Sequence, residues 1–559
     1  MMKRVSRRSL SSLKSLREGN LNFINGQRID GSGSSFDVFE PRTGDLLCKI
    51  KSTSKKELDN ALSIAKSAQL EWMQTSALER ADVLHQAALL LEKYREEIAY
   101  VETVDNGKPI LESRIDIQSA IDALKYCGGT SIALLAGETQ SGNGWKGSSY
   151  RVPVGVCAGI GAWNYPIQVA AFKSAPALAC GNAVIYKPSE FCPLSAVLLG
   201  EVFAEAGLPS GLYQVIQGQG ELGRAISEHS AVDKISFTGS VPTGQAILRA
   251  SAEHVRPVTL ELGGKSPLVV FDDFDEDIAV QGILQANFYS QGQVCSNGTR
   301  VFLHENVYQT IKTKLIDAVD QIKVEDPLED QTRFGALVSK QHLEKVQGFI
   351  SRAISEGGKI VSSSRNIETD LGGYYMRPVV MECHDHMEMT KAEHFGPICQ
   401  IYKFKTEEEV LRRANDSNLG LAAGVFTNDF HRVDRFIENF EAGTLYVNCY
   451  NLAPAELGFG GFKQSGIGKE NGVEYVNQFT KLKTCFYPKE QSRKLRLKKS
   501  HENEAVQRTT LFLCPRRRST DWRENSYTSI KTTNRPTTCS SRSSGSSRIN
   551  WKYQFCSWH

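Results

Sequence analysis

Apolar residues along the first third of the chain recur at the spacing of an α-helix. One such series consists of Ala81, Leu84, Ala88 and Leu91, which would share one helical face. Two capping boxes, in which a glutamate follows a serine three residues later, predict where helices begin: Ser54 with Glu57, and Ser76 with Glu79. Upstream, residues 21–24 followed by Asn25-Gly26 predict a β-hairpin. We therefore expect a β-hairpin followed by amphipathic helices whose main role is packing.

From residue 183 onward, short apolar runs alternate with helical segments. We expect strands over residues 183–186, 213–216, 234–237 and 258–260. A helix should begin after Pro193 and end near Gly207. Buried strands separated by helices indicate a parallel sheet with crossover helices, so the predicted fold class is α/β. Ligands on such sheets bind beyond the carboxyl ends of the strands, where functional residues should be sought.

Length and composition place the chain among globular proteins of two or three domains. It has 559 residues, of which 40% are hydrophobic and 23% charged. No apolar run approaches the roughly 18 residues of a membrane span, so we expect no membrane partner. The 13 cysteines are irregularly spaced, which favours a reducing compartment over a disulfide framework.

The two ends of the chain are basic and differ from the body. Residues 1–19 combine Arg, Lys and Ser with Leu10, Leu13 and Leu16 on one possible helical face, a composition typical of a mitochondrial targeting leader. A disordered basic leader is the alternative. Residues 489–559 lose the hydrophobic pattern and are rich in Ser and Arg, which predicts a disordered tail. Interleaved Arg and aromatic residues could bind RNA, but a tail without function is favoured, and we expect no nucleic-acid partner.

Two glycine-containing segments are candidates for phosphate binding. The first is Gly218, Gly220 and Gly223, spaced as G-x-G-x-x-G after an expected strand. This motif is weak, because the acidic residue expected about 20 positions later is missing. The second runs from Gly239 through Ser240, Val241, Pro242 and Thr243 into an expected helix, whose first amides could hold an anion. An ordinary serine N-cap would explain the second segment equally well.

A lysine and a glutamate follow another expected strand. Lys187, Ser189 and Glu190 lie just after residues 183–186, at the edge of the sheet where a cofactor would bind. The lysine and the carboxylate could hydrogen-bond ribose hydroxyls, and the carboxylate would repel a 2′-phosphate, which favours NAD over NADP. A solvated surface pair is the alternative.

Several motifs in order along the chain resemble those of the NAD(P)-dependent aldehyde dehydrogenase superfamily. The similarity extends from about residue 20 to residue 488 and includes the following motifs: AWNYP at 162–166, VTLELGGKSP at 258–267, QGQVCSNGTR at 291–300, EHFGP at 393–397 and GGFKQSG at 460–466. Within the superfamily, the chain is most similar to the branch that oxidises 4-trimethylaminobutyraldehyde.

The resemblance implies a covalent mechanism with three catalytic residues. Cys295 would be the nucleophile, since a thiolate adds to an aldehyde carbon and forms a hydrolysable thioester. Asn164 would donate its amide to the oxyanion together with the backbone N–H of Cys295, although a turn residue before Tyr165-Pro166 is the local alternative. Glu261 would activate the hydrolytic water, with its pKa raised by desolvation; a rim salt bridge is the alternative.

The resemblance also implies where NAD and the aldehyde bind. The expected cofactor residues lie at strand ends and helix starts: Ile160, Ala162, Trp163, Lys187, Ser189, Glu190, Gly220, Gly239, Ser240, Val241, Pro242, Thr243, Glu393 and Phe395. The expected substrate residues are aromatic: Tyr165, Phe172, Phe288 and Phe459. Aromatic faces could hold a trimethylammonium group, as in 4-trimethylaminobutyraldehyde. A tunnel for betaine aldehyde or for aliphatic aldehydes in general is the alternative.

The implied architecture has three parts. An NAD-binding domain would comprise residues 20–140 and 156–261, a catalytic domain residues 262–476, and an oligomerisation arm residues 141–155 and 477–488. The arm would pair subunits into a homodimer or homotetramer, since a lone hairpin is marginally stable. The compartment would be the cytoplasm or the mitochondrial matrix.

Two other functions were weighed against this interpretation. A Cys–His hydrolase would also use Cys295, but no histidine partner is evident. A non-catalytic protein that kept the fold would be expected to lack Cys295, Glu261 or Asn164, and all three are present. We expect no metal site, because Cys383-His384-Asp385-His386 has no second ligand pair at zinc spacing. The glycosylation sequence Asn297-Gly298-Thr299 lies within the catalytic motif, so we expect it to be unused.

Overall fold

The computed structural model describes residues 10–362, 367 and 369–488 of the chain. These residues divide into two units, a large one that contains residues 10–137 and 149–483 and a small one that contains residues 138–148 and 484–488. Residues 1–9 and 489–559 lie outside the described part. They are the first nine residues of the predicted leader and the whole of the predicted tail.

The first sheet of the large unit is the one that the alternating sequence pattern predicts. Its eight strands lie in the order β2 (Gln27–Ile29), β1 (Asn22–Ile24), β9 (Tyr213–Val215), β8 (Ala183–Lys187), β7 (Val156–Ile160), β10 (Lys234–Thr238), β11 (Val258–Glu261) and β21 (Gly466–Ile467). The five strands from β9 to β11 are parallel. The α/β fold class and the four strands expected between residues 183 and 260 are confirmed.

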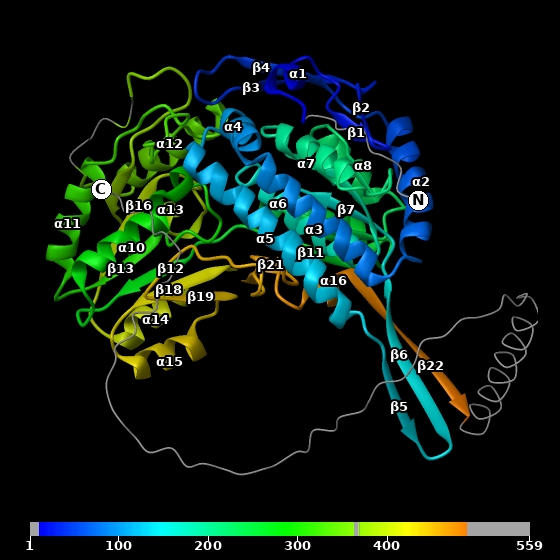
Figure 1. The fold of residues 1–559 in the computed structure, drawn as a ribbon. Helices are drawn as coiled ribbons and strands as arrows, with labels where there is room; N and C mark the ends of the chain where they lie inside the picture. Colours follow the sequence, from blue (N-terminus) through cyan, green and yellow to red (C-terminus); the bar gives the residue numbers. More distant parts are fainter. Residues whose placement is uncertain (1–9, 363–366, 368, 489–559) are drawn as a thin grey trace, which may run out of the picture. The chain divides into compact units, whose positions relative to one another are not determined.

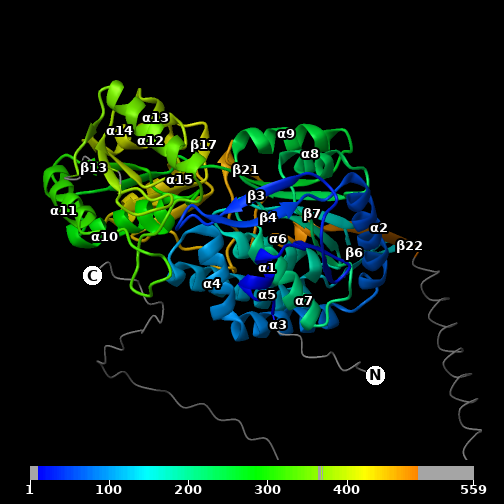
Figure 2. The same ribbon diagram turned by 90° about the horizontal axis from the view of Figure 1, so that it is seen from above.

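Helices cover both faces of this sheet. Figure 2 shows α8 (Gly220–Glu228) and α9 (Val241–Ala252) on one side, and α3 (Ala77–Lys93), α5 (Ile110–Leu134) and α7 (Leu194–Glu205) on the other. The remaining helices of this part are α2 (Lys55–Trp72), α4 (Arg95–Asn106), α6 (Pro166–Ala179) and α16 (Tyr475–Phe479). The central strands β7 and β8 are buried along their whole length, because helices cover both faces of the sheet.

A second sheet, parallel except for its edge strand β14, forms the other half of the large unit (Figure 1). Its strands lie in the order β14 (Lys359–Ile360), β15 (Val379–Glu382), β16 (Ile398–Phe404), β13 (Arg300–His304), β12 (Pro267–Val270), β18 (Ala422–Phe426) and β19 (Thr444–Val447). Its helices are α10 (Glu276–Phe288), α11 (Tyr308–Asp320), α12 (Lys340–Ser355), α13 (Glu388–Lys391), α14 (Glu407–Asn415) and α15 (Phe430–Asn439). A separate hydrophobic cluster, which includes Phe302, Val346 and Phe436, forms the core of this half.

Local sequence signals account for several element boundaries. Ser54 and Ser76 each accept a hydrogen bond from the backbone of the glutamate three residues later, and each glutamate bonds back, so both capping boxes are confirmed. Asn25 and Gly26 have φ of 53° and 75°, as a two-residue hairpin turn requires. A further hairpin joins β3 (Ser35–Phe39) to β4 (Leu46–Lys51), and short strands β17 (Leu419–Gly420) and β20 (Phe462–Lys463) pair with each other.

The segments predicted to form the arm belong to a three-stranded sheet. Its strands are β22 (Thr480–Pro488), β6 (Trp145–Pro153) and β5 (Glu138–Gly142), in that order, so the first segment begins earlier than predicted. Within the small unit, Trp145 and Phe486 pack edge to face with ring centroids 5.9 Å apart. Both aromatic rings are exposed in the single chain, and the role of this sheet in oligomerisation stays a prediction.

The described part of the predicted leader packs onto the first sheet's domain. Helix α1 (Leu13–Arg17) begins at the N-cap Ser12, and Leu16 is fully buried in the main hydrophobic cluster. Arg28 donates hydrogen bonds to the hydroxyls of Ser11 and Ser15 and to the carbonyls of Ser15 and Gly19. Residues 10–19 are thus part of a folded domain, whereas the sequence pattern had placed them in a separate leader. Among the described helices, none is long and apolar enough to cross a membrane.

We predict that Leu16→Ala destabilises the protein by about 2–5 kcal/mol, because it leaves a cavity in a packed core. Urea unfolding of the two proteins measures the difference. Leu89→Ala is the control, since Leu89 is 58% exposed on α3 and its truncation should have little effect. Equal stability losses in the two variants would mean that residues 10–19 do not belong to the core.

Candidate active site

Cys295 follows a turn with an unusual backbone. Ser290, Gln291 and Gly292 have φ of 50°, 53° and 72°, which places three consecutive residues in the left-handed region. Non-glycine residues pay for this conformation in strain, and such strain is concentrated at functional sites. A side chain on Gly292 would collide with the backbone of Gly396, so the turn packs closely against the segment that precedes strand β16. This turn fixes the direction in which the chain enters the segment that carries Cys295.

Two carboxyl groups lie close enough to the thiol of Cys295 to influence its ionisation. Its pKa is raised to about 12, first by burial and then by the charges of Glu393 and Glu261. The protein at rest therefore holds a protonated thiol, which must lose its proton before it can attack a carbonyl carbon. No histidine within the described ranges hydrogen-bonds to this sulfur.

Asn164 reaches the loop that carries Cys295. It is 4% exposed and lies between β7 and α6. One N–H of its side-chain amide donates to the carbonyl of Gln293 at 2.9 Å. Because an amide has two N–H donors, the bond to Gln293 orients the group and leaves the second donor for a substrate oxygen. The fold thus brings the predicted oxyanion donor next to the predicted nucleophile's loop.

Glu261 ends strand β11 and is buried, with a 5% exposed residue surface. Neither carboxyl oxygen has a hydrogen-bond partner among the residues described. Burial and the neighbouring Glu470 raise its pKa well above the ordinary value, and Lys173 and Lys469 oppose that shift. A side chain on Gly460 would meet the carboxyl oxygen, so this glycine leaves the space that Glu261 occupies.

No sequence motif indicated the second polar group near Glu261, which consists of Lys173 and Glu470. Lys173 donates to Glu470 at 2.5 Å, and the Ser236 hydroxyl donates to the same oxygen at 3.0 Å. The available signal was Lys173 itself, the one charged residue in the sequence of α6, PIQVAAFKSAPALA. A lysine in a fully buried helix requires a partner, but the partner lies almost 300 residues away.

The predicted ribose-binding residues lie together at the carboxyl edge of the first sheet. Lys187 is 4% exposed; its ammonium lies 3.0 Å from the Pro188 carbonyl and 3.7 Å from the Glu190 carboxylate. Ser189 is buried, and its hydroxyl accepts from the amide of Phe191. Strand β7 ends beside them at Ile160, which pairs with Lys187. The lysine and the carboxylate are therefore adjacent, as the interpretation as a ribose site requires.

The two candidate phosphate segments also lie at this edge. Ser240 caps α9 by accepting from the Thr243 amide, so the N-cap is real, and Val241 and Pro242 form the first helical turn. Gly220 begins α8, and a side chain there would meet nothing within 4 Å. The Thr238 hydroxyl, just before Gly239, is buried and has no partner among the residues described. Open space, exposed helix starts and an unpaired hydroxyl fit a phosphate-containing cofactor.

The predicted nicotinamide residues meet at the boundary between the two sheets' domains. Glu393 accepts a hydrogen bond from the Gly264 amide at 3.0 Å. The Phe395 ring packs edge to face on Trp163 with centroids 5.2 Å apart, next to the half-buried Ala162. Phe395 has a φ of 58°, and its carbonyl contacts the His342 ring nitrogen at 2.7 Å. No motif had singled out His342.

The predicted substrate residues are aromatic side chains of unequal exposure. Tyr165 caps α6, and its phenol pKa is raised by burial, by Asp116 and Glu112, and by Cys295. Phe172 and Phe459 are half-buried, the second paired through its backbone with Glu470. Phe288 ends α10 and is fully buried. The contribution of Cys295 to the shift of the Tyr165 pKa places this ring near the predicted nucleophile.

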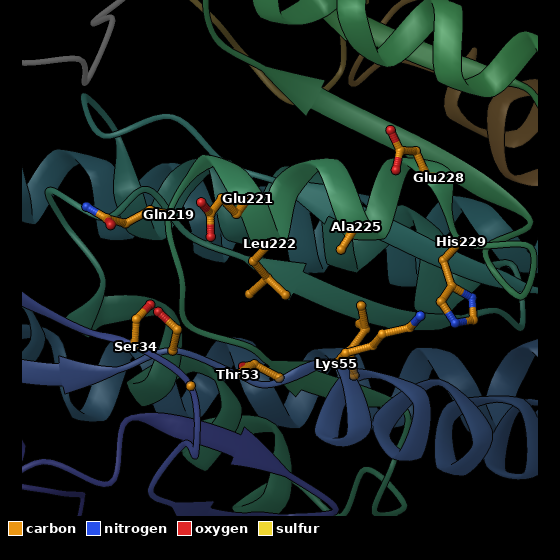
Figure 3. Close-up of a pocket in the computed structure, with 12 residues that line it drawn as sticks. Ser34, Thr53, Lys55, Gln219, Glu221, Leu222, Ala225, Glu228 and His229 are labelled. Carbon is orange, nitrogen blue, oxygen red and sulfur yellow. The ribbon is translucent and has the colours of Figure 1, made fainter.

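Figure 3 shows a pocket of about 500 Å³ elsewhere in the large unit. It lies between α8 and the start of α2, with side chains such as Gln219, Leu222, Lys55 and His229 on its walls. Its lining contains none of the predicted catalytic residues. Helix α8, which forms one wall of the pocket, begins at the predicted cofactor residue Gly220.

Two sequence motifs have structural explanations. Asp385 pairs with Arg413 at 2.8 Å, and His384 and His386 stack with nearly parallel rings. In the described ranges, no group of three or more His, Cys, Asp and Glu is placed to hold a metal ion. Asn297 is 2% exposed and hydrogen-bonds Asn451.

Comparisons with known proteins agree with this geometry. Residues 29–485 match the profile of the aldehyde dehydrogenase family. The 4-trimethylaminobutyraldehyde dehydrogenase B of Danio rerio is 48% identical over 472 residues, which are 83% of this chain and 91% of that protein. A structure of the aldehyde dehydrogenase of Bacillus cereus with NAD+ superimposes with a TM-score of 0.81 at 36% identity, covering 84% of this chain and 96% of that one.

A second solved structure, betaine aldehyde dehydrogenase of Staphylococcus aureus with NAD+, has a TM-score of 0.82 at 31% identity and covers 85% of this chain and 97% of that one. The chain belongs to the aldehyde dehydrogenase family. It has the fold of that family, and it is an enzyme of the aldehyde dehydrogenase class.

We predict that Glu393→Gln speeds alkylation of Cys295 by iodoacetamide. Removing the stronger of the two neighbouring charges lowers the thiol pKa, and each unit of decrease gives about tenfold more thiolate. In the wild type, the rate should keep rising with pH beyond 9, because the thiol pKa is about 12. Mass spectrometry of the Cys295 peptide measures the rate, with Glu305→Gln as a surface control. A variant rate at or below that of the wild type would contradict the electrostatic assignment.

Proposed function

We propose that this protein oxidises an aldehyde to a carboxylic acid with NAD as the hydride acceptor and Cys295 as the nucleophile. The observation that carries the proposal is that the half-buried Cys295, whose pKa responds to the charges of Glu393 and Glu261, lies on a loop to which Asn164 is hydrogen-bonded. This arrangement supplies a nucleophile, an oxyanion donor and a base in one site.

The first half of the reaction forms a bond to sulfur. The Cys295 thiol loses its proton, with Glu261 as the nearby acceptor, and the thiolate attacks the aldehyde carbon. The carbonyl oxygen becomes an oxyanion that accepts hydrogen bonds from the second N–H of Asn164 and from the Cys295 amide. Removing one such donor typically lowers kcat about 10²–10³-fold. Hydride then leaves the carbon, the C=O double bond re-forms, and a thioester remains on Cys295.

The second half of the reaction is hydrolysis. Glu261 first releases to solvent the proton that it took from Cys295. It then accepts a proton from water, whose oxygen adds to the thioester carbon, and the sulfur leaves with its electron pair and takes that proton back from Glu261. Because burial raises the pKa of Glu261, this carboxyl group is a stronger base than an exposed glutamate. Lys173 and Glu470, which are hydrogen-bonded to each other, lie near Glu261. This polar pair offers a route for the proton away from the carboxyl group. The products are a carboxylic acid and the free thiol.

The residues at the edge of the first sheet fit NAD. When bound, NAD supplies the acceptor for the hydride. Lys187 and Glu190 would hold the adenosine ribose, the α9 start from Gly239 to Thr243 the pyrophosphate, and Glu393 with Phe395 the nicotinamide end. Ile160, Ala162, Trp163, Ser189 and Gly220 would line the path between them. The NAD+ bound in the two similar solved structures supports this assignment.

We propose 4-trimethylaminobutyraldehyde as the substrate, which would yield 4-trimethylammoniobutanoate, a step of carnitine synthesis. The name of the Danio rerio relative supports this choice. The Lys108 ammonium covers one face of the Tyr165 ring, 4.3 Å from its centroid, so the opposite face of this ring is the one that would receive a quaternary ammonium through cation–π attraction. Betaine aldehyde is the second candidate, supported by the similar Staphylococcus aureus enzyme.

The three-stranded sheet of β5, β6 and β22 would serve as the arm of a homodimer or homotetramer. Its exposed apolar side chains, among them Leu482, Phe486 and Tyr487, support an unfilled interface. For the compartment, the cytoplasm and the mitochondrial matrix both stay possible sites of this activity.

The substrate assignment predicts that the enzyme prefers the charged aldehyde to an uncharged aldehyde of the same shape. We expect kcat/KM for 4-trimethylaminobutyraldehyde to exceed that for 5,5-dimethylhexanal, its uncharged carbon isostere, by about 10-fold, since cation–π attraction of 1–2 kcal/mol corresponds to that ratio. NADH absorbance measures both rates, with betaine aldehyde alongside. Cys295→Ala should remove activity with every aldehyde, and activity that survived in it would refute the mechanism. Equal turnover of the two isosteres would refute the charged substrate but would not contradict the proposed oxidation of aldehydes.

The cofactor assignment predicts the effect of Glu190→Gln. The carboxylate repels the 2′-phosphate of NADP, so its neutralisation should raise kcat/KM with NADP while that with NAD changes little or falls. Glu228→Gln, at the exposed C-terminal end of α8, is the surface control. An unchanged ratio of NADP to NAD use in Glu190→Gln would remove Glu190 from the ribose site.

A further inference from the structure

The end of α4 and the start of α5 hold four side chains that each bond to the backbone of a catalytic segment. Glu102 accepts from the Ile167 amide at 3.1 Å, and Asn106 donates to the Trp163 carbonyl at 2.7 Å. The third and fourth contacts are made by Lys108 to the Asn164 carbonyl at 2.6 Å and by Glu112 to the Ser290 amide at 3.2 Å. With Asp116, which pairs with Lys108, they form a group that we name the polar cradle.

The polar cradle is buried and contains charges that the reaction itself does not use. Its five residues are between 0 and 5% exposed. Burying an ammonium group costs several kcal/mol unless its hydrogen bonds are satisfied. Here the Lys108 ammonium has a carboxylate, a carbonyl and the face of the Tyr165 ring at 4.3 Å around it. Buried ion pairs of this kind often add no stability over an apolar pair, so their retention calls for another explanation.

We propose that the polar cradle positions Asn164 and the left-handed turn at 290–292 for catalysis, with Lys108 fixing Asn164 and Glu112 fixing the turn. The inference rests on the proposed function, because it assigns a purpose to residues around that site. None of the five side chains reaches the reacting atoms in the mechanism above, so they are positioning residues.

The contact of Lys108 sets the direction of the oxyanion donor. Lys108 holds the backbone carbonyl of Asn164, while the carbonyl of Gln293 holds the side-chain amide of the same residue. Two bonds at opposite ends of Asn164 leave one amide N–H with a defined direction. Preorganised donors are effective because they do not reorient during the reaction, and a displacement of about 1 Å can cost about 100-fold in rate.

The contact of Glu112 holds the strained turn. Ser290 and Gln291 adopt a conformation that L-residues avoid, so the turn persists only if surrounding contacts enforce it. Glu112 binds the first amide of the turn from α5, in the first sheet's domain, while the Val338 amide binds the Gln293 side chain from the second. The turn is thus held from both sides of the site.

The test compares variants of Lys108 and Glu112 in the full-length enzyme with 5,5-dimethylhexanal, whose lack of charge removes any attraction to the carboxylates. We expect Lys108→Met to lower kcat about 100-fold with KM for NAD within about twofold of wild type. Glu112→Ala should lower kcat about 10-fold, whereas Glu112→Gln, which keeps an acceptor oxygen for Ser290, should stay within about twofold. Asn182→Ala is the control, since Asn182 is a fully buried residue that bonds backbone groups away from the site; it should lose stability but not kcat.

A double-mutant cycle separates positioning from general stabilisation. If Lys108 acts through Asn164, Lys108→Met should cause little further loss of kcat in an Asn164→Ala background. Multiplicative losses, or a wild-type kcat in Lys108→Met, would overturn the proposal. If Lys108→Met does not fold, the pair Glu112→Ala and Glu112→Gln decides, and equal losses in those two would also overturn it.

The same measurements distinguish failure of the proposed function from failure of the positioning proposal. A wild type that oxidises none of the aldehydes would refute that function, and the rate of Cys295 alkylation by iodoacetamide would then test the cradle. Glu112→Ala should change that rate at least fivefold and Glu112→Gln should not, because only the first frees the turn. Equal alkylation rates in wild type and Glu112→Ala would overturn the cradle. A kcat/KM loss confined to 4-trimethylaminobutyraldehyde would instead assign these carboxylates to substrate attraction.

Discussion

Burial of ionisable groups is the constraint on which the rest of the site depends. The low polarity of the interior raises the pKa of Cys295, Glu261 and Glu393 together, so each group ionises at a higher pH than it would in water. A protonated thiol is protected from stray reaction, and a carboxyl group with a raised pKa becomes a useful base when it ionises. The same low polarity strengthens every hydrogen bond directed at a developing charge. The protein therefore has to hold these groups rigidly, because misplaced buried charges are costly.

The topology of the two parallel sheets places these groups within reach of each other. Strands β7, β8, β10 and β11 all run in one direction, so the residues after them, including Lys187 and Glu261, gather at one edge. The second sheet brings the Cys295 loop and Glu393 to the boundary between the two domains, where Glu393 bonds the Gly264 amide. Glycines at 263, 264 and 460 allow this approach because a side chain would collide with the carboxyl groups or the Cys295 backbone.

Helices α4 and α5 connect this boundary to the main hydrophobic core. Their buried polar side chains contact the backbone of segments 163–167 and 290, which come from different parts of the chain. A helix pair packed against α3, α6 and α7 is a rigid support, so contacts made from it can hold a strained turn. The burial of α1 through Leu16 and Arg28 extends the same domain toward the N-terminus.

The sequence determined the local elements and indicated the candidate reactive residues. Capping boxes at Ser54 and Ser76, the turn at Asn25-Gly26 and the β–α alternation after residue 183 depend on neighbours within a few positions, so they could be predicted. The motifs around Cys295, Glu261 and Asn164 named a chemistry for the same reason.

The tertiary structure alone decided what surrounds those residues. It placed Lys173 against Glu470, His342 against Phe395 and Lys108 against Asn164, and it packed Leu16 in a core where the sequence suggested a leader. These partners are separated by between 53 and 297 positions, and no local pattern encodes such pairs. A burial-dependent pKa or hydrogen bond exists only after the chain has folded and excluded water, which is why composition and spacing could not supply it.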